Sequence, residues 1–231
     1  MKVVILSGGN GVRLSEETRS KPKALVKIGR KPIIWHIINH YVKYNYNEFV
    51  IALGYKGKMI ADELPQFCNN DIKIQYINTG EDTENAGRLK RLKSIIGDER
   101  FMMTWCDGLS DINIQDLLKF RKQHNKIATL TAVNPRSKYG CLNLKQDIVT
   151  HFQEKPIRNN EWINGGFFIL EPEIFNYIEG DRTNWEKDVL RVLAEEGNLM
   201  AYKHLSFWQC MDTINEKLLL NKIWSDGKAK W

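Results

Sequence analysis

The feature that most constrains this chain is a short apolar run that ends in a glycine-rich turn. Residues 3–6 read Val-Val-Ile-Leu, and residues 7–11 read Ser-Gly-Gly-Asn-Gly. This pattern predicts a buried strand that opens into a tight turn. Because glycine has no side chain and tolerates unusual dihedral angles, its backbone N–H groups can approach an anion closely. Arg13 and Lys23 follow the turn, so the segment is typical of a polyphosphate site.

Two better-known glycine loops do not fit this turn. A Walker A loop requires Gly-Lys followed by Ser or Thr after four intervening residues, and the segment lacks that sequence. The dinucleotide fingerprint Gly-x-Gly-x-x-Gly matches at Gly9 and Gly11 but has Leu14 in its last position. A glycine turn after a strand is also common as a purely structural turn. Arg13 and the Lys-Pro-Lys sequence at residues 21–23 favour the anion-binding interpretation.

Composition narrows the function classes further. The 231 residues are enough for one α/β domain with a full core. The formal net charge of +6 comes from scattered basic residues without a nucleic-acid motif, so we expect anionic small substrates and no nucleic acid. The four cysteines form no Cys-x-x-Cys pair, which argues against a zinc site and a disulfide framework. No signal peptide or membrane-spanning stretch is evident, so we expect a cytoplasmic protein without membrane contact.

Strand-like and helix-like segments alternate through the first half of the chain. This alternation predicts an α/β fold with a Rossmann-like, mostly parallel sheet flanked by helices, and with ligands at the carboxyl ends of the strands. The glycine turn and Asp107 both follow predicted strands, so they should meet at that edge. The predicted strands are 3–7, 49–53, 73–77, 101–105 and 128–133, and the predicted helices are 32–42, 89–96 and 114–123.

The pattern changes from about residue 138 onward. Short predicted strands at 142–144, 149–153 and 166–170 surround a turn at 154–156. Helices are expected at 172–177, 185–195 and 213–224. No linker, repeat or low-complexity segment separates the halves, so residues 1–231 are interpreted as a single domain with a second lobe fused onto the first.

Several blocks of the sequence, taken in order, resemble the sugar-1-phosphate nucleotidylyltransferases. They are Leu-Ser-Gly-Gly-x-Gly-x-Arg-Leu at residues 6–14, Lys-Pro-Lys at 21–23, Gln-Glu-Lys-Pro at 153–156, Ile-Asn-Gly-Gly-Phe-Phe at 163–168 and Phe-Trp-Gln-Cys-Met-Asp-Thr at 207–213. The last two blocks match the cytidylyl branch best. The resemblance covers essentially the whole chain.

This resemblance implies a reaction. A nucleotidyl group, best matched by that of CTP, would pass from a nucleoside triphosphate to a sugar 1-phosphate, best matched by α-D-glucose 1-phosphate. The products would be CDP-glucose and pyrophosphate, and Mg²⁺ would assist the in-line attack. It also implies a homo-oligomer, and it makes residues of about 1–137 the nucleotide-binding half and about 138–231 the sugar-phosphate-binding half.

Asp107 and Asp212 are the metal ligands that the resemblance implies. Asp107 follows a strand and precedes a glycine, so its side chain can project into a cleft. Each aspartate also has a structural alternative, a turn residue for Asp107 and the N-cap of the last helix for Asp212. His36 and His40 lie four apart on a predicted helix, but no third ligand is apparent, which favours packing.

The remaining site residues are carried over from the family in the same way. Arg13 and Lys23 are the expected catalytic cations. The nucleotide-binding residues would be Leu6, Ser7, Gly8, Gly9, Asn10, Gly11, Val12, Arg13, Lys23, Thr79, Gly80 and Arg88. The sugar-phosphate-binding residues would be Glu154, Lys155, Asn164, Gly165 and Trp208.

The sequence departs from the family at a few positions. Val12 stands where a threonine is usual, Asn10 replaces a small or apolar residue, and Cys106 precedes Asp107 in place of a glycine. The stretch between Glu63 and Thr79 is short. A different sugar phosphate or base, and a catalytically silent regulator that binds nucleotide sugars, are therefore alternatives; retention of the charged site residues argues against the silent form.

Overall fold

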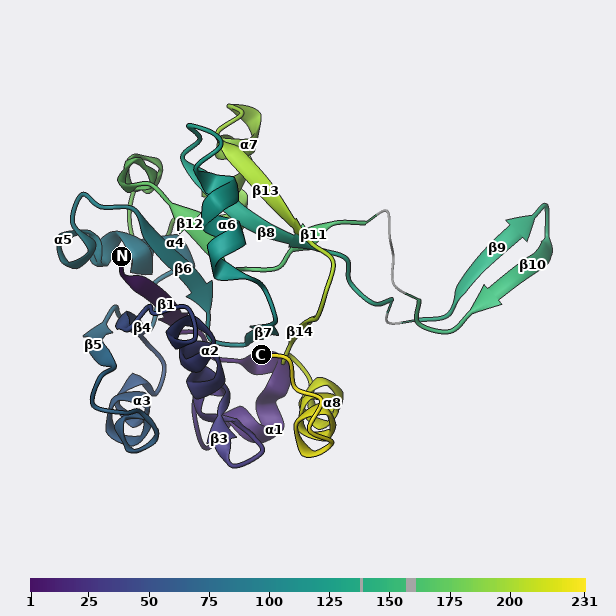
Figure 1. Cartoon of the computed structure of the whole chain (residues 1–231), viewed down its shortest axis with the longest axis horizontal. Coiled ribbons are helices and arrows are strands. Elements are labelled where there is room, and N and C mark those ends of the chain that lie inside the picture. Colours follow the sequence, from purple (N-terminus) through teal and green to yellow (C-terminus); the bar gives the residue numbers. More distant parts are fainter. Residues whose placement is uncertain (138, 157–160) are drawn as a thin grey trace.

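A central sheet organises the computed structural model, which describes residues 1–137, 139–156 and 161–231 (Figure 1). Its strand order is β11-β8-β12-β6-β1-β4-β5, and β13 also pairs with β8. Neighbours β1, β4, β5 and β6 are parallel, as are β8 and β13, whereas β11 and β12 are antiparallel to their partners. The predicted α/β fold is confirmed. The strands are β1 (Val3–Ser7), β4 (Glu48–Leu53), β5 (Lys73–Asn78), β6 (Phe101–Trp105), β8 (Ala128–Val133), β11 (Ile163–Asn164), β12 (Phe168–Leu170) and β13 (Leu199–His204).

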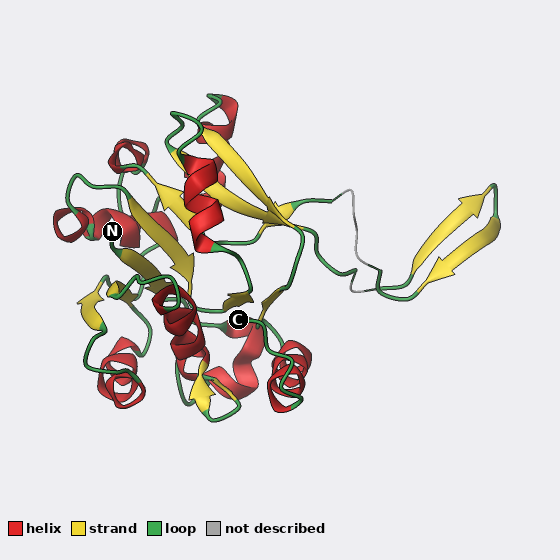
Figure 2. Cartoon of the chain, viewed as in Figure 1, coloured by secondary structure: helices red, strands yellow, loops and turns green. Residues whose placement is uncertain are grey.

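Helices cover both faces of this sheet, as Figure 2 shows, and alternate residues of β1 enter two separate cores. Val3 and Ile5 belong to one core, and Val4 and Leu6 to the other. A strand that is buried on both faces reads as a continuous apolar run, which explains the opening of the sequence. The first core includes residues of α2 (Ile33–Val42), α3 (Gly57–Glu63), α6 (Ile114–Arg121) and α8 (Ile214–Ser225). The second includes residues of α4 (Asn85–Arg91), α5 (Lys93–Ile96), η4 (Pro172–Tyr177), η5 (Trp185–Leu190) and α7 (Arg191–Glu195).

Short elements connect this framework. They are η1 (Val12–Leu14), α1 (Ser15–Thr18), η2 (Lys23–Leu25), β2 (Lys27–Ile28), β3 (Lys31–Pro32), η3 (Leu64–Phe67), β7 (Gly108–Ser110) and β14 (Trp208–Cys210). The helix predicted at 185–195 is a π-helical segment, η5, that continues as α7. The sequence pattern did not indicate β13, whose strand conformation depends on pairing with β8.

The short strands predicted in the second half separate into two places. The predicted 166–170 strand is seen as β12, which lies in the central sheet between β6 and β8. The other two, β9 (Cys141–Lys145) and β10 (Ile148–Gln153), pair with each other as a two-stranded sheet. Strands from both predicted halves thus share one sheet, and the expected boundary at 138 falls outside the described residues.

The hairpin of β9 and β10, called the arm here (residues 141–153), projects from the body of the molecule (Figure 1). Its large apolar side chains are between 50% and 68% exposed; they are Leu142, Leu144, Ile148, Val149 and Phe152. Elsewhere in the described parts of the chain, apolar side chains of this size mostly fill the two cores. None of the described helices is long and apolar enough to cross a membrane.

Candidate active site

A cavity of about 440 Å³ opens beyond the carboxyl ends of β1 and β6. This is the edge of the sheet where the alternating pattern predicted a ligand site. The predicted site residues that line it are Leu6, Gly9, Gly11, Val12, Arg13, Lys23, Asp107, Asn164, Gly165, Trp208 and Asp212. A larger hollow of about 780 Å³, between η4 and α7, contains no predicted site residue.

The glycine turn presents backbone amides to this cavity. Gly11 has a φ of +61°, and a Cβ there would lie 2.9 Å from Cγ2 of Thr18, so the position requires glycine. Nothing lies within 4 Å of a Cβ built on Gly9, so that side of the turn is open. Among the described residues, the N–H groups of Gly9, Asn10 and Gly11 donate to no acceptor. Such unpaired amides are suited to phosphate oxygens.

Arg88 lies beneath the turn rather than in the cavity. The residue is only 2% exposed, and its guanidinium donates to the carbonyls of Gly8 (3.1 Å) and Glu81 (3.0 Å) and to Oγ1 of Thr79 (3.0 Å). A Cβ on Gly8 would lie 2.2 Å from this guanidinium. Neither Arg88 nor Thr79 lines the cavity, because their side chains hydrogen-bond to each other and to main-chain carbonyls of the surrounding loops. Their contact with nucleotide stays a prediction. Ser7, Gly8, Asn10 and Gly80 also lie outside the cavity lining.

A small two-stranded sheet brings the two aspartates together. Strand β14 pairs antiparallel with β7, which aligns Cys210 with Gly108. The N–H of Met211 donates to the carbonyl of Asp107 at 2.9 Å. Asp107 precedes β7 and Asp212 follows β14, so the antiparallel pairing places both carboxylates at one end of this sheet.

Lys23 lies between these carboxylates. Its Nζ is 2.6 Å from Oδ2 of Asp107 and 2.6 Å from Oδ1 of Asp212, and Arg13 contacts Oδ2 of Asp212 at 2.9 Å. Burial alone would lower the pKa of Lys23, but the two carboxylates outweigh it and raise that pKa above its ordinary value. Burial likewise tends to raise the pKa of Asp212, yet Lys23 and Arg13 hold it below its usual range. The four side chains thus form one charged cluster.

The chemistry of this pair of carboxylates fits magnesium. Mg²⁺ is bound through one or two carboxylates together with phosphate oxygens. Asp107 and Asp212 both contact one ammonium, so they already face the same cation-sized position, with Gly9 and Gly11 lining the same cavity. Of the residues present, these two aspartates are the ones that would hold the ion.

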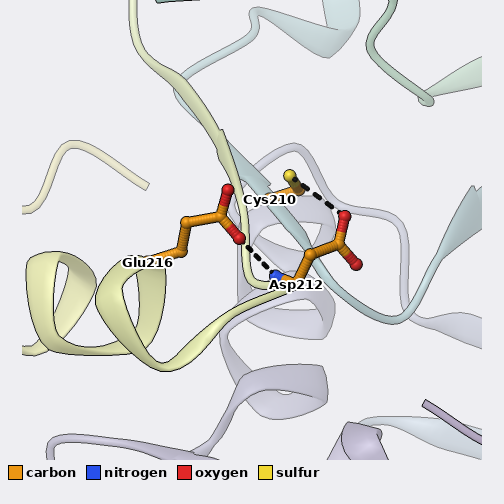
Figure 3. A group of neighbouring side chains, drawn as sticks. All are labelled: Cys210, Asp212 and Glu216. Carbon is orange, nitrogen blue, oxygen red and sulfur yellow. Dashed lines mark hydrogen bonds between the residues drawn. The ribbon is translucent and has the colours of Figure 1, made fainter. Parts of the chain in front are cut away.

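Cys210 and Glu216 lie beside Asp212 and form a compact group with it (Figure 3). Oε2 of Glu216 accepts from the N–H of Asp212 (2.7 Å) and of Thr213 (2.9 Å), and Thr213 caps the first turn of α8. The structure therefore overturns the N-cap alternative for Asp212, because the N-cap is Thr213. Burial raises the pKa of the Cys210 thiol to about 12, and a sulfur ligand suits softer metals, whereas Mg²⁺ prefers oxygen ligands. The group orients Asp212.

The predicted sugar side of the cavity is shaped by close backbone packing. A Cβ on Gly165 would lie 2.8 Å from Cγ1 of Val133, so only glycine fits there. Nε1 of Trp208 donates to the carbonyl of Gly165 at 2.7 Å, and Oδ1 of Asn164 accepts from the N–H of Gly166 at 3.0 Å. These bonds fix the indole and the amide at the cavity wall.

Glu154 and Lys155 are not brought to this cavity. They follow β10 at the base of the arm, and their side chains are 62% and 61% exposed and contact each other at 3.7 Å. The cause is the hairpin itself, because β9 and β10 pair with each other and not with the central sheet. The structure thus separates the Glu-Lys-Pro block from the other blocks of the predicted site.

Other residues of the cavity were not predicted from the sequence. They are Asn85, Thr104, Trp105, Cys106, Gly108, Glu186 and Cys210. Thr104, Trp105 and Cys106 could have been found, because they directly precede Asp107 on a predicted strand. No local signal marks Asn85 or Glu186, which reach the cavity through α4 and η5. Burial raises the pKa of Glu186, and π-helical turns such as η5 are frequent at functional sites.

The two helical histidines are packing residues, as the sequence favoured. Both are at most 4% exposed, and their Nε2 atoms contact the carbonyls of Ile28 (3.0 Å) and Ile112 (2.9 Å). Burial lowers the pKa of His36 and of His40 to about 4. They are therefore neutral at physiological pH and lie in the first core.

Comparisons with known proteins identify the family. The model of the nucleotidyl transferase family matches residues 2–227. A glucose-1-phosphate cytidylyltransferase of Salmonella typhimurium is 40% identical over 253 residues, covering 100% of this chain and 98% of the relative. A probable glucose-1-phosphate cytidylyltransferase of Bacillus subtilis is 38% identical over 252 residues, covering 100% and 99%.

Solved structures support the fold. HddC from Yersinia pseudotuberculosis superposes with a TM-score of 0.77 at 22% identity, covering 96% of this chain and 99% of that one. A UDP-glucose pyrophosphorylase complexed with UDP-glucose gives a TM-score of 0.74 at 17% identity, covering 98% of each chain. The family model and these relatives show that the chain belongs to the nucleotidyl transferase family and is a nucleotidyltransferase.

Proposed function

We propose that this enzyme transfers the cytidylyl group of CTP to α-D-glucose 1-phosphate and releases pyrophosphate, giving CDP-glucose. The observation that carries the proposal is the convergence of the glycine turn, Lys23, Asp107 and Asp212 on one cavity. The names of the most similar relatives support the choice of CTP and of glucose 1-phosphate.

The chain's own residues suit this reaction without a covalent intermediate. A phosphate oxygen of the sugar phosphate forms a bond to the α-phosphorus, and the bond from that phosphorus to the oxygen bridging the α- and β-phosphates breaks. Negative charge grows on the departing pyrophosphate. The free amides of Gly9 and Gly11, together with Arg13 and Lys23, supply positive charge in the cavity, which aligns two anions and stabilises the leaving group.

Magnesium is the proposed cofactor, held by Asp107 and Asp212. When bound, the ion supplies positive charge to phosphate oxygens, which lowers the repulsion between the two substrates. The remaining work belongs to protein groups. Glu216 and the thiol of Cys210 keep Asp212 oriented, because they bond to its backbone and to its carboxylate (Figure 3).

The sugar phosphate is proposed to contact Asn164, Gly165 and Trp208, which line the cavity, and Lys155 and Glu154 from the base of the arm. Because the structure places that last pair outside the cavity, their contact with the sugar phosphate requires either a movement of the arm or their insertion into the cavity of a second copy.

Homo-oligomer formation is part of the proposal. It is supported by the exposed apolar side chains of the arm, since an isolated two-stranded hairpin is marginally stable and large exposed apolar patches mark interaction sites.

A cytoplasmic setting is proposed as well. The four cysteines are all free thiols, which suits a reducing compartment.

The experiment that tests the proposed function is pyrophosphate release across a matrix of nucleoside triphosphates and sugar 1-phosphates. CTP with glucose 1-phosphate should give the highest kcat/KM, because a site built to hydrogen-bond one base edge leaves buried groups unpaired with another base. If UTP or dTTP reaches an equal or higher kcat/KM, the choice of CTP is wrong. Release with a different sugar 1-phosphate at higher efficiency would overturn the choice of glucose.

A further inference from the structure

Lys23 occupies the position that touches both aspartates. Its ammonium contacts Asp107 and Asp212 at the same distance, 2.6 Å. We propose that Lys23 is the built-in cation of this carboxylate pair, and that a divalent ion must displace its ammonium to bind both aspartates. The inference rests on the proposed function only for the identity of the metal site.

The ammonium is held at this position by the local fold. Lys23 begins η2, directly after Pro22, and the N–H of Leu25 donates to the Pro22 carbonyl at 2.9 Å. Ala24, Leu25 and Val26 are at most 3% exposed, and the side chain of Lys23 is 10% exposed. The lysine has therefore already lost most of its conformational freedom, so its contact with the carboxylates carries little further entropic cost. A dissolved cation has no such advantage.

The carboxylates require a cation between them. Two carboxylates that share one site repel each other unless one of them is protonated or a positive charge lies between them. Arg13 does not fill this role, because it contacts Asp212 alone and its side chain is 74% exposed. One oxygen from each aspartate lies within 2.6 Å of a single nitrogen, so this position accommodates one cation at a time.

The same geometry indicates where the displaced ammonium goes. Lys23 lines the cavity together with Gly9, Gly11 and Arg13, where phosphate oxygens are expected. Charge-assisted hydrogen bonds to those oxygens would replace its bonds to the aspartates. Metal binding and triphosphate binding then favour each other, and the coupling is reciprocal. In the nucleotide-free protein, molecules in which Lys23 bridges the aspartates cannot bind the metal with both carboxylates. The apparent metal affinity is therefore reduced to the fraction of molecules in which the bridge is open.

The test is the affinity of the nucleotide-free protein for Mn²⁺, measured by electron paramagnetic resonance of the free ion. Lys23→Met keeps a long, flexible side chain and removes the charge. We expect this variant to bind Mn²⁺ at least about tenfold more tightly than the wild type, since the apparent dissociation constant varies inversely with the fraction of molecules competent to bind. Lys23→Gln is the second variant, in case the Lys23→Met protein does not fold. Asp107→Asn in the Lys23→Met background should abolish the gain, which locates the ion.

Arg13→Met is the matched control, because it removes one positive charge that contacts the same Asp212 but does not bridge. It should tighten Mn²⁺ binding less than about threefold, as expected for a solvent-screened charge. Equal gains in Arg13→Met and Lys23→Met would overturn the proposal, because overall charge would then explain both. Folded Lys23 variants with unchanged Mn²⁺ affinity would overturn it too. No substrate enters this measurement, so its failure is distinct from failure of the pyrophosphate-release assay on the wild type.

Discussion

The cavity and the arm are built in opposite ways. In the cavity, each charged side chain belongs to a segment that is fixed by another part of the chain: Asp107 by β14, Asp212 by Glu216 and the glycine turn by Arg88. In the arm, β9 and β10 pair only with each other within the described structure, and the apolar side chains face solvent. The difference indicates that the charged cluster around Lys23 is held in place within one chain, whereas we propose that the arm packs against a second copy.

The largest effect should follow from removing the charge of Asp107 in the cavity. Asp107→Asn keeps the shape but removes the charge, and should lower turnover by about 10²-fold or more, the scale for loss of one preorganised electrostatic group. Pyrophosphate release measures it, with chelator and added magnesium as a check on metal dependence. The control is Asp116→Asn on the exposed face of α6, which should stay near normal. Near-normal turnover of Asp107→Asn would remove Asp107 from the mechanism.

A pair of lysine variants compares the two regions directly. Lys23→Ala should mainly impair use of CTP, whereas Lys155→Ala should mainly raise the KM for the sugar phosphate, each by roughly tenfold to a hundredfold, the scale of hydrogen bonds to charged groups. Initial rates with each substrate varied in turn separate the two effects. Identical defects in both variants would show that the assignment of one lysine to each substrate is wrong.

Mixing two impaired variants tests whether Lys155, at the base of the arm, acts on the cavity of its own chain; activity is measured at a sugar-phosphate concentration well below the KM of Lys155→Ala. Asp107→Asn and Lys155→Ala affect different regions, so mixed oligomers regain activity only if Lys155 acts on the cavity of another copy. Each variant remixed with itself is the control. Unrestored activity, despite subunit exchange, would assign Lys155 to its own chain.

The apolar surface of the arm can be removed by substitutions that leave the cavity residues unchanged. Leu144→Ser together with Ile148→Ser should shift sedimentation velocity from an oligomer toward a monomer, because both side chains are more than 60% exposed in the single chain. Circular dichroism should show an unchanged fold. The matched control is Leu205→Ser, an exposed leucine between β13 and β14 and outside the arm, which should keep the wild-type assembly. A wild-type sedimentation profile for the double variant would contradict the role of the arm.

A smaller effect is expected at Glu186, the cavity carboxylate that sequence patterns missed. Glu186→Gln keeps the volume and should raise one substrate's KM by about tenfold with little change in kcat, as expected when a carboxylate that accepts hydroxyl hydrogens is lost. Glu195→Gln, on the solvent-exposed surface of α7, is the control. An unchanged KM for both substrates would show that Glu186 lines the cavity without binding either of them.

The smallest effect concerns pH and the core near the cavity. Since burial lowers the pKa of His36 and His40 to about 4, the unfolded chain binds more protons than the folded protein from about pH 7 down to about pH 4. Stability therefore decreases as the pH decreases through this range, with a loss of about 0.7 kcal/mol per imidazole from pH 7 to pH 6. Urea unfolding at the two pH values measures the change. His151→Gln, in the exposed arm, should leave that difference unaltered.

The sequence predicted what is encoded locally. The alternating apolar runs predicted the parallel strands and the sheet edge at which the cavity opens, and the strand-end position of Asp107 predicted its place at that edge. Contacts between distant segments could not be derived in this way. The pairing of β14 with β7, the approach of Glu186 through η5, and the separation of Lys155 from the cavity all depend on which strands meet.

Arg88 also shows how a buried charge acts without touching a ligand. Its guanidinium is bonded to main-chain carbonyls and a hydroxyl, and the charges that act on it are Glu84, of opposite sign, and Arg91, of like sign. Its positive charge is therefore only partly offset, and it lies in protein of low dielectric directly under the glycine turn. The field of this charge extends into the cavity and attracts anions before any contact is made. The glycine turn and the buried charge of Arg88 beneath it thus attract an anion together, although Arg88 does not line the cavity.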